Sequence, residues 1–170
     1  MSQVFLKTAT QDSVATPPAV YAALDGHFHF DFDPCPLQPT FDGLAPGTQW
    51  GACNYVNPPF SCIADWVARA VASRARCVML LPFRTNTRYW REHVWPNARI
   101  VYVFTKPMAF PGYGNRPFPT PIVAVVLDPP TTTASTGTGP GLPAPPVLTE
   151  IGGYPVVTMT ITRGASAAPE

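Results

Sequence analysis

Charged residues, long apolar runs and paired cysteines are all scarce in this sequence. Only 12% of the 170 residues are charged and the net charge is +1, so no overall positive field attracts nucleic acid, and DNA binding would need a local basic patch or another chain. No apolar run approaches the roughly 20 residues that a membrane helix needs, and no signal peptide is evident at the start. We therefore expect a soluble, intracellular protein without membrane contact.

The cysteines argue against a zinc protein and against a disulfide-bonded one. Four are present, at positions 35, 53, 62 and 77, and no two of them form a Cys-x-x-Cys pair. His27 and His29 do not complete a familiar zinc spacing with them. We expect no metal site, and reduced thiols that are mostly buried.

Composition divides the chain into four parts. Hydrophobic residues make up 46% of it, which is enough for one domain with a real core. We predict an N-terminal arm over 1–15, an α/β domain over 16–127, a Thr/Gly/Pro-rich insertion over 128–146, and a C-terminal β-hairpin with a tail over 147–170.

Within 16–127, segments with strand and helix periods alternate. The stretch 27–33 alternates strictly, with Phe28, Phe30 and Phe32 on one face, whereas the apolar positions after Ser61 follow the helical template. Because such alternation is typical of βαβ units, we predict a mainly parallel sheet in an α/β sandwich. The expected strands are 27–33, 52–56, 77–81, 100–104 and 121–127, and the expected helices are 16–26, a segment from Ser61 to Val71, and 87–95.

The tetrapeptide Asn57-Pro58-Pro59-Phe60 follows the expected strand 52–56. The exocyclic amine of adenine or cytosine is a poor nucleophile, because its lone pair is delocalised into the ring, and acceptors that favour a pyramidal nitrogen would activate it. The Asn57 side-chain oxygen and the Pro58 carbonyl can be those acceptors, and Phe60 can stack on the flipped base. Asn57 cannot ionise, so we expect direct in-line attack on the methyl group of S-adenosylmethionine without a general base. The same residues also suit an ordinary strand-ending turn.

Two aspartates are candidate cofactor contacts. Asp33 ends the expected strand 27–33, and ligands of open α/β sheets bind at the carboxyl ends of strands, so its carboxylate could pair with the ammonium of a methionine moiety. Asp42 could reach a ribose hydroxyl. Either residue could instead be an ordinary turn aspartate.

Two polar loops follow later strands and carry cations. Such loops can bind phosphates or line the pocket of a flipped base. The alternatives are a loop leading into a capped helix and a mobile surface loop. The candidate residues are Arg84, Thr85, Thr87 and Arg88 in the first loop, and Lys106 and Arg116 in the second, which is also aromatic and glycine-rich.

Six segments stand in a characteristic order: Thr16-Pro17-Pro18, Asp33-Pro34-Cys35, Asp42-Gly43-Leu44, Tyr55 to Phe60, Leu81 to Trp90, and Pro117-Phe118-Pro119. In this order and spacing, the region 16–127 resembles the phage-type DNA N-6-adenine methyltransferases (Dam-like). The chain departs from that family at three points. It lacks the glycine-rich first motif of larger methyltransferases, has Phe60 where Tyr is frequent, and has Lys106-Pro107 where Gly-Arg is frequent.

The resemblance implies a compact class I, Rossmann-like methyltransferase fold, with S-adenosylmethionine as methyl donor and adenine in DNA as acceptor. It implies a catalytic motif at Asn57, Pro58, Pro59 and Phe60. The implied cofactor contacts are Thr16, Pro17, Asp33, Cys35, Asp42 and Asn57, and the implied substrate contacts are Phe60, Arg84, Thr85, Thr87, Arg88, Lys106 and Arg116.

We therefore predict an adenine-specific DNA methyltransferase, located in the host cytoplasm if it is phage-encoded. The near-zero net charge and the extension 128–170 leave open a catalytically inactive binding module or virion-associated structural subunit, with a protein partner on that extension. Transfer to N-4 of cytosine or to RNA also stays open, because the same two acceptors serve any exocyclic amine.

Overall fold

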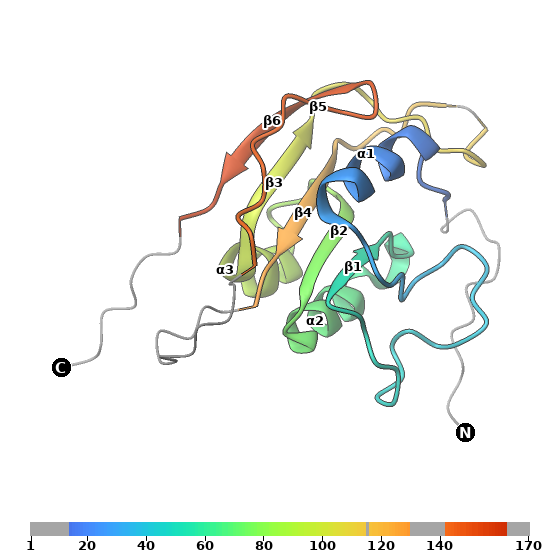
Figure 1. Cartoon of the computed structure of the whole chain (residues 1–170). Helices are drawn as coiled ribbons and strands as arrows, with labels where there is room; N and C mark the ends of the chain where they lie inside the picture. Colours follow the sequence, from blue (N-terminus) through green and yellow to red (C-terminus); the bar gives the residue numbers. More distant parts are fainter. Residues whose placement is uncertain (1–13, 115, 130–141, 163–170) are drawn as a thin grey trace.

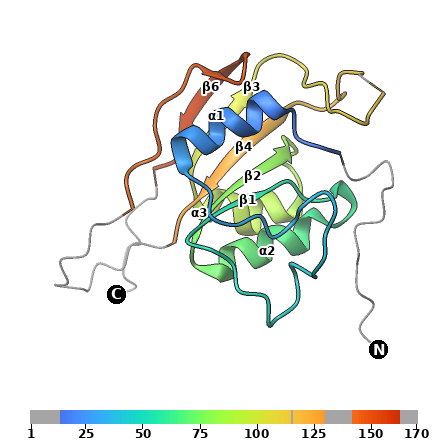
Figure 2. The same ribbon diagram turned by 45° about the vertical axis from the view of Figure 1, so that its right-hand side comes forward.

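The computed structural model describes residues 14–114, 116–129 and 142–162. These residues form one six-stranded sheet with helices on both faces (Figures 1 and 2). The expected arm 1–15 and insertion 128–146 lie largely outside the described residues, as does the tail 164–170. The strands are β1 (Cys53–Val56), β2 (Arg76–Pro82), β3 (Ala98–Phe104), β4 (Ile122–Leu127), β5 (Glu150–Ile151) and β6 (Tyr154–Thr160); the helices are α1 (Pro18–Phe28), α2 (Ile63–Ser73), a π-helical turn Trp90–Val94 and the short α3 (Trp95–Asn97), with a 3-10 turn at Phe60–Cys62.

The expectation of a mainly parallel, Rossmann-like sandwich is wrong. The strand order is β1-β2-β4-β3-β6-β5; among these described strands only β1 and β2 pair in parallel, whereas the other four pairings are antiparallel. In the described part of the chain no helix joins β3 to β4, and a parallel neighbour needs such a crossover. The sheet is therefore mixed and mostly antiparallel, and it curls (Figure 1).

Both faces of this sheet are covered, which explains the uniformly apolar strands. All seven residues of β2 and all six of β4 are buried. Along β2, Val78 and Leu80 face the layer that contains α1, whereas Met79 and Leu81 face the layer that contains α2 and the π-helical turn. A strand buried on both faces has no polar positions to mark its direction.

The expected strand 27–33 is also largely wrong. Helix α1 continues to Phe28, because Val20, Leu24 and Phe28 fall four residues apart and all three are buried. His29 ends the helix in the left-handed region, at φ 54°. Only Phe32 then forms a bridge, in parallel with Asn54 of β1.

The loops that the sequence marks as candidates leave from one end of the sheet, where three strands terminate. β2 and β3 both run antiparallel to β4, and β1 runs parallel to β2, so β1, β2 and β3 share a direction. Their carboxyl ends, at Val56, Pro82 and Phe104, consequently lie at the same end of the sheet. The loops that begin with Asn57, Phe83 and Thr105 leave from it.

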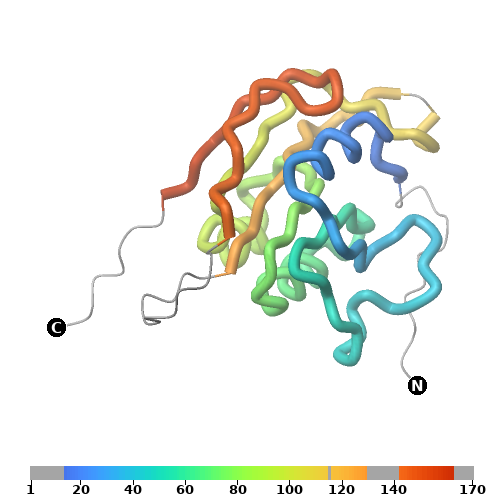
Figure 3. Tube along the Cα trace, viewed as in Figure 1, coloured from blue at the N-terminus to red at the C-terminus, as the bar shows by residue number. Residues whose placement is uncertain are grey.

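A C-terminal hairpin docks on the first helix. Ile151 pairs with Tyr154, so Gly152 and Gly153, at φ 58° and 83°, form a two-residue turn of the kind that needs positive φ at both positions. A Cβ atom on Gly152 would lie 2.5 Å from the backbone of Ala19 in α1. The turn therefore packs closely on the backbone of α1, and in Figure 3 the hairpin, in orange and red, continues along the side of the sheet next to β3.

No helix in the described part of the chain is long and apolar enough to cross a membrane.

Candidate functional site

The corner after β1 is shaped by its two prolines. A residue before proline avoids the helical region, so the chain stays extended through Pro59, at φ −58° and ψ 135°. The 3-10 turn at Phe60–Cys62 follows, and α2 begins at Ile63. Asn57 is only 5% exposed, and Pro58 is buried as well.

The Asn57 side chain is held by the segment that precedes α1. Its Nδ2 donates to the carbonyl of Val14 at 2.8 Å and to Oγ1 of Thr16 at 3.1 Å. A backbone carbonyl only accepts hydrogen bonds, so the atom that faces Val14 is the nitrogen. The orientation of Asn57 Oδ1 is thereby fixed on the opposite side of the amide.

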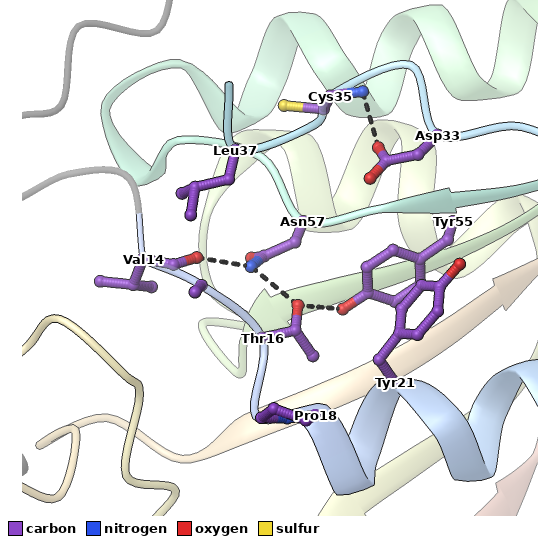
Figure 4. A pocket seen from close by; sticks show the side chains of 10 residues that line it. Val14, Thr16, Pro18, Tyr21, Asp33, Cys35, Leu37, Tyr55 and Asn57 are labelled. Atoms are coloured by element: carbon purple, nitrogen blue, oxygen red, sulfur yellow. Dashed lines mark hydrogen bonds between the residues drawn. The ribbon is translucent and has the colours of Figure 1, made fainter. Parts of the chain in front are cut away.

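Thr16 links Asn57 to a buried tyrosine. Its Oγ1 lies 2.5 Å from the hydroxyl of Tyr55, and the three side chains form a continuous chain of hydrogen bonds in Figure 4. Burial raises the pKa of Tyr55 far above its usual value, and the charge of Asp33 raises it further against the lowering effect of the Thr16 hydrogen bond. Tyr55 is therefore a neutral phenol at physiological pH.

These side chains line a cavity of about 290 Å³ between the start of α1 and the end of β1 (Figure 4). Its wall combines hydroxyl, amide and carboxylate groups with apolar side chains. Four residues that the sequence marks as cofactor contacts lie in this wall, although they come from well-separated segments: Thr16, Asp33, Cys35 and Asn57. The remaining lining residues are Val14, Ala15, Pro18, Tyr21, Leu37 and Tyr55.

Asp33 is positioned by its own turn. One carboxylate oxygen accepts a hydrogen bond from the Cys35 backbone N–H at 2.8 Å, an arrangement that Asp before Pro favours. The charges of Asp25 and Asp33 add to the effect of burial in raising the pKa of Tyr21. The carboxylate of Asp33 and the ring of Tyr21 thus share one side of the cavity.

Two residues that the sequence marks as cofactor contacts lie outside this wall. Pro17 is buried at the start of α1, where its carbonyl accepts hydrogen bonds from the N–H groups of Val20 and Tyr21. Asp42 closes a local turn, since its Oδ1 accepts from the Leu44 N–H at 2.9 Å and its carbonyl accepts from the Thr48 hydroxyl at 2.6 Å.

Phe60, three residues after Asn57, lies in a cluster of aromatic rings. It contacts Phe118 edge-on at 5.0 Å and Phe110 at 6.4 Å between ring centroids, and Tyr113 joins the cluster through Phe118. The loop that carries them is closed on itself by a hydrogen bond from the Phe118 N–H to the Met108 carbonyl, at 2.8 Å. Phe60 is half-buried, so part of its ring is accessible beside this loop.

The candidate cations lie in loops at the same end of the sheet, but they do not line the cavity. Arg84, Lys106 and Arg116 are exposed. Arg88 is also exposed and forms an ion pair with Glu92 at 2.8 Å, which contributes little to stability at such a site. Thr85 is half-buried, and Thr87 donates a hydrogen bond to the Arg84 carbonyl and so closes the loop.

Sequence reasoning missed Tyr55, Tyr21, Val14 and Leu37 as parts of the wall. Tyr55 had a usable signal, because it stands two residues before Asn57 on a strand and period two brings both to one face. Val14 takes part through its backbone carbonyl, for which no residue type is diagnostic. Tyr21 and Leu37 reach the cavity through the tertiary arrangement alone.

A scan against models of protein families, a search of curated proteins and a search of solved structures each find no match. Membership in the Dam-like family therefore stays a prediction from the motifs. Among the described residues, no group of three or more His, Cys, Asp or Glu side chains is arranged to hold a metal ion.

Proposed function

We propose that this protein binds S-adenosylmethionine in the cavity beside Asn57 and transfers its methyl group to the exocyclic amine of adenine in DNA. The observation that carries the proposal is the shared cavity of Asn57 and Asp33. The amide of the first has its orientation fixed by Val14 and Thr16, and the second is a carboxylate suited to an ammonium group.

The lining suits this cofactor in size and chemistry. A volume of about 290 Å³ lies near the lower end of the range of roughly 300–1,000 Å³ for small-molecule sites. Asp33 offers an acceptor for the ammonium group, the hydroxyls of Thr16 and Tyr21 offer partners for polar groups, and Val14 and Leu37 offer apolar surface. When bound, the cofactor supplies an electrophilic methyl group next to a positively charged sulfur.

The protein contributes positioning. Asn57 Oδ1 accepts one hydrogen of the target amine and the Pro58 carbonyl accepts the other, which favours a nucleophilic, pyramidal nitrogen. Phe60 stacks on the target base, and the exposed cations Arg84, Lys106 and Arg116 contact the flanking phosphates. No side chain takes up a proton before attack, because Asn57 does not ionise and Tyr55 stays neutral.

The mixed sheet does not weigh against this chemistry, because function resides in the site and not in the fold class. The proposed groups come from the ends of β1, β2 and β3 and from the segments before and after α1. The carboxyl ends of these three strands lie at one end of the mixed sheet, as they would in a parallel sheet.

The test is identification of the methylated base. Purified protein is incubated with S-adenosylmethionine and unmethylated DNA, the DNA is digested to nucleosides, and the products are separated by mass. We expect N6-methyldeoxyadenosine. N4-methyldeoxycytidine would move the target to cytosine, and absence of any methylated nucleoside, in DNA and in a parallel RNA reaction, would contradict methyl transfer.

An asparagine pair supplies the control for this assay. Asn57→Ala removes the acceptor and should reduce methyl transfer by at least about a hundredfold, the loss typical of one preorganised hydrogen-bonding group. Asn97→Ala removes an asparagine that bonds to the His93 carbonyl at the start of β3, at the opposite edge of the sheet, and should leave the rate nearly unchanged. Full activity of Asn57→Ala would refute the role given to Asn57.

A further inference from the structure

One long connection carries three residues of the cavity wall. The segment 33–51 contains neither a helix nor a strand of the sheet, and Asp33, Cys35 and Leu37 near its start line the cavity. A connection of this length without secondary structure is usually functional or disordered. Because no strand or helix holds this part of the wall, its position depends on contacts that the segment makes with itself and with α2.

The closest of these contacts is made by Gly43. A Cβ atom at this position would lie 2.8 Å from the carbonyl carbon of Pro34 and closer still to its oxygen, which is nearer than real Cβ atoms come to backbone. Gly43 does not have positive φ, so lack of space, and not backbone conformation, requires glycine there. Pro34 stands between Asp33 and Cys35, and both Gly43 and Pro34 are buried. Gly43 therefore packs directly on the backbone of the cavity wall.

Trp50 holds the Gly43 turn on helix α2. Its Nε1 donates a hydrogen bond to the Gly43 carbonyl at 2.9 Å. Its indole ring stacks on Trp66 of α2, at 6.2 Å between ring centroids, and the guanidinium of Arg69 lies 5.3 Å from its centroid. Arg69 also donates to the Thr48 carbonyl at 2.8 Å. Helix α2 thus supports the turn, and the turn supports the wall.

We propose that Gly43 is a positioning residue for the cofactor, which acts through Pro34 and does not touch the ligand. This inference rests on the proposed function. Gly43 is not among the residues that line the cavity. A side chain at position 43 would displace Pro34 by about 1 Å, and a misplacement of that size away from the chemistry can cost about a hundredfold in rate. The proposed DNA contacts lie in other loops, so the loss concerns the cofactor and not the DNA.

The experiment titrates the full chain with S-adenosylmethionine by calorimetry and follows DNA binding by fluorescence anisotropy. Gly43→Ala should weaken cofactor binding at least about tenfold, as part of the loss that such a misplacement causes, and should leave the affinity for DNA unchanged. Gly47→Ala is the matched control, because it lies in the same segment and its Cβ would meet nothing within 4 Å. It should bind the cofactor like the native protein.

Trp50→Phe tests the same support without forcing a group against the backbone. It keeps an aromatic ring beside Trp66 and Arg69 but loses the hydrogen bond to the Gly43 carbonyl, so it should weaken cofactor binding by a smaller factor than Gly43→Ala. Circular dichroism shows whether each variant is folded. If Gly43→Ala does not fold, the comparison of Trp50→Phe with Gly47→Ala decides.

The outcomes separate this inference from the proposed function. A purely structural role would lower the melting temperature of folded Gly43→Ala without changing its Kd for the cofactor, and that result refutes the positioning role while the cofactor site stands. Native affinity in Trp50→Phe, an equal loss in Gly47→Ala, or an equal loss of DNA affinity refutes it as well. Failure of the native protein to bind S-adenosylmethionine at millimolar concentration refutes the cofactor site itself, and the positioning role with it.

Discussion

At the scale of single residues, the hydroxyl of Thr16 connects two side chains of the cavity wall. It contacts the amide nitrogen of Asn57 and the hydroxyl of Tyr55, both of which belong to largely buried residues. Thr16→Val keeps the shape of the side chain but leaves Tyr55 without this partner and Asn57 with one bond fewer. We expect a loss of about 1–3 kcal/mol in the free energy of unfolding, the cost of unsatisfied buried polar groups, measured by urea denaturation.

Thr16→Ser is the matched control, because it restores the hydroxyl. It should recover most of the lost stability and most of the methyl-transfer rate. If Thr16→Val and Thr16→Ser behaved alike in both measurements, the hydroxyl would not position Asn57.

Two cysteine thiols, the buried Cys77 and the half-buried Cys53, predict a loss of stability at alkaline pH. Burial raises the pKa of Cys77 from 9.0 to about 12 and that of Cys53 to about 11, in each case as the largest cause. Between these values and 9 the unfolded chain releases thiol protons that the folded chain retains, so the free energy of unfolding falls as pH rises. The slope is at most about 1.4 kcal/mol per pH unit for each group.

Urea denaturation at pH 8 to 11 measures this slope. Cys77→Ala removes one titrating thiol and should make the slope shallower, even though the smaller side chain lowers stability at every pH. An identical slope in the native protein and in Cys77→Ala would contradict the assignment to Cys77.

At the scale of elements, the two glycines of the β5–β6 turn form a natural comparison. Both have positive φ, so alanine at either site costs roughly 1 kcal/mol in backbone strain. A Cβ on Gly152 would also meet the backbone of Ala19 at 2.5 Å, whereas a Cβ on Gly153 meets nothing within 4 Å. Gly152→Ala should therefore lower the melting temperature clearly more than Gly153→Ala, and equal effects would mean that the turn does not pack tightly on α1.

The positions of several strands were predictable, but their directions were not. β1, β2, β3 and β4 lie within about two residues of the apolar runs that predicted them. Burial of both faces produces the same apolar run in a parallel and in an antiparallel strand. The loop 105–121 starts β4 beside the carboxyl end of β3, so that the two strands are antiparallel, but no residue pattern in the loop predicts this direction. The strand expected at 27–33 failed because the four-residue spacing of Val20, Leu24 and Phe28 extended the preceding helix.

The candidate site shows a similar division. Thr16, Asp33, Cys35 and Asn57 share one cavity, although sequence separates them by up to 41 positions. Asp42 is not among the residues that line it, and its carboxylate and carbonyl take part in a local turn.

At the scale of the whole molecule, the low net charge predicts a weak salt dependence of DNA binding. Only Arg84, Lys106 and Arg116 are proposed to contact phosphates, since Arg88 is paired with Glu92. Three such contacts give a slope of about −3 for the logarithm of the association constant against the logarithm of salt concentration on duplex DNA, and about −2 on single strands. Fluorescence anisotropy across a salt series measures the slope.

Lys106→Ala should bring that slope about one unit closer to zero. All other cations of the chain, including Lys7 outside the described residues, are common to both proteins and cancel in this comparison. A slope near −8 in the native protein would show that a much larger basic surface takes part.

The docking of the β5–β6 turn on α1 has a consequence for the order in which the protein matures. The wall of the cavity includes Val14 and Thr16, immediately before α1, yet that helix packs against Gly152 of the hairpin, and β6 pairs with β3. During synthesis the first helix therefore lacks part of its packing surface until the hairpin has left the ribosome, and contacts this distant in sequence form slowly. In a nascent chain that ends before residue 150, α1 lacks the hairpin against which it packs, so the cavity wall that precedes α1 is not held in place beside Asn57. Ligand binding is therefore expected only late in translation.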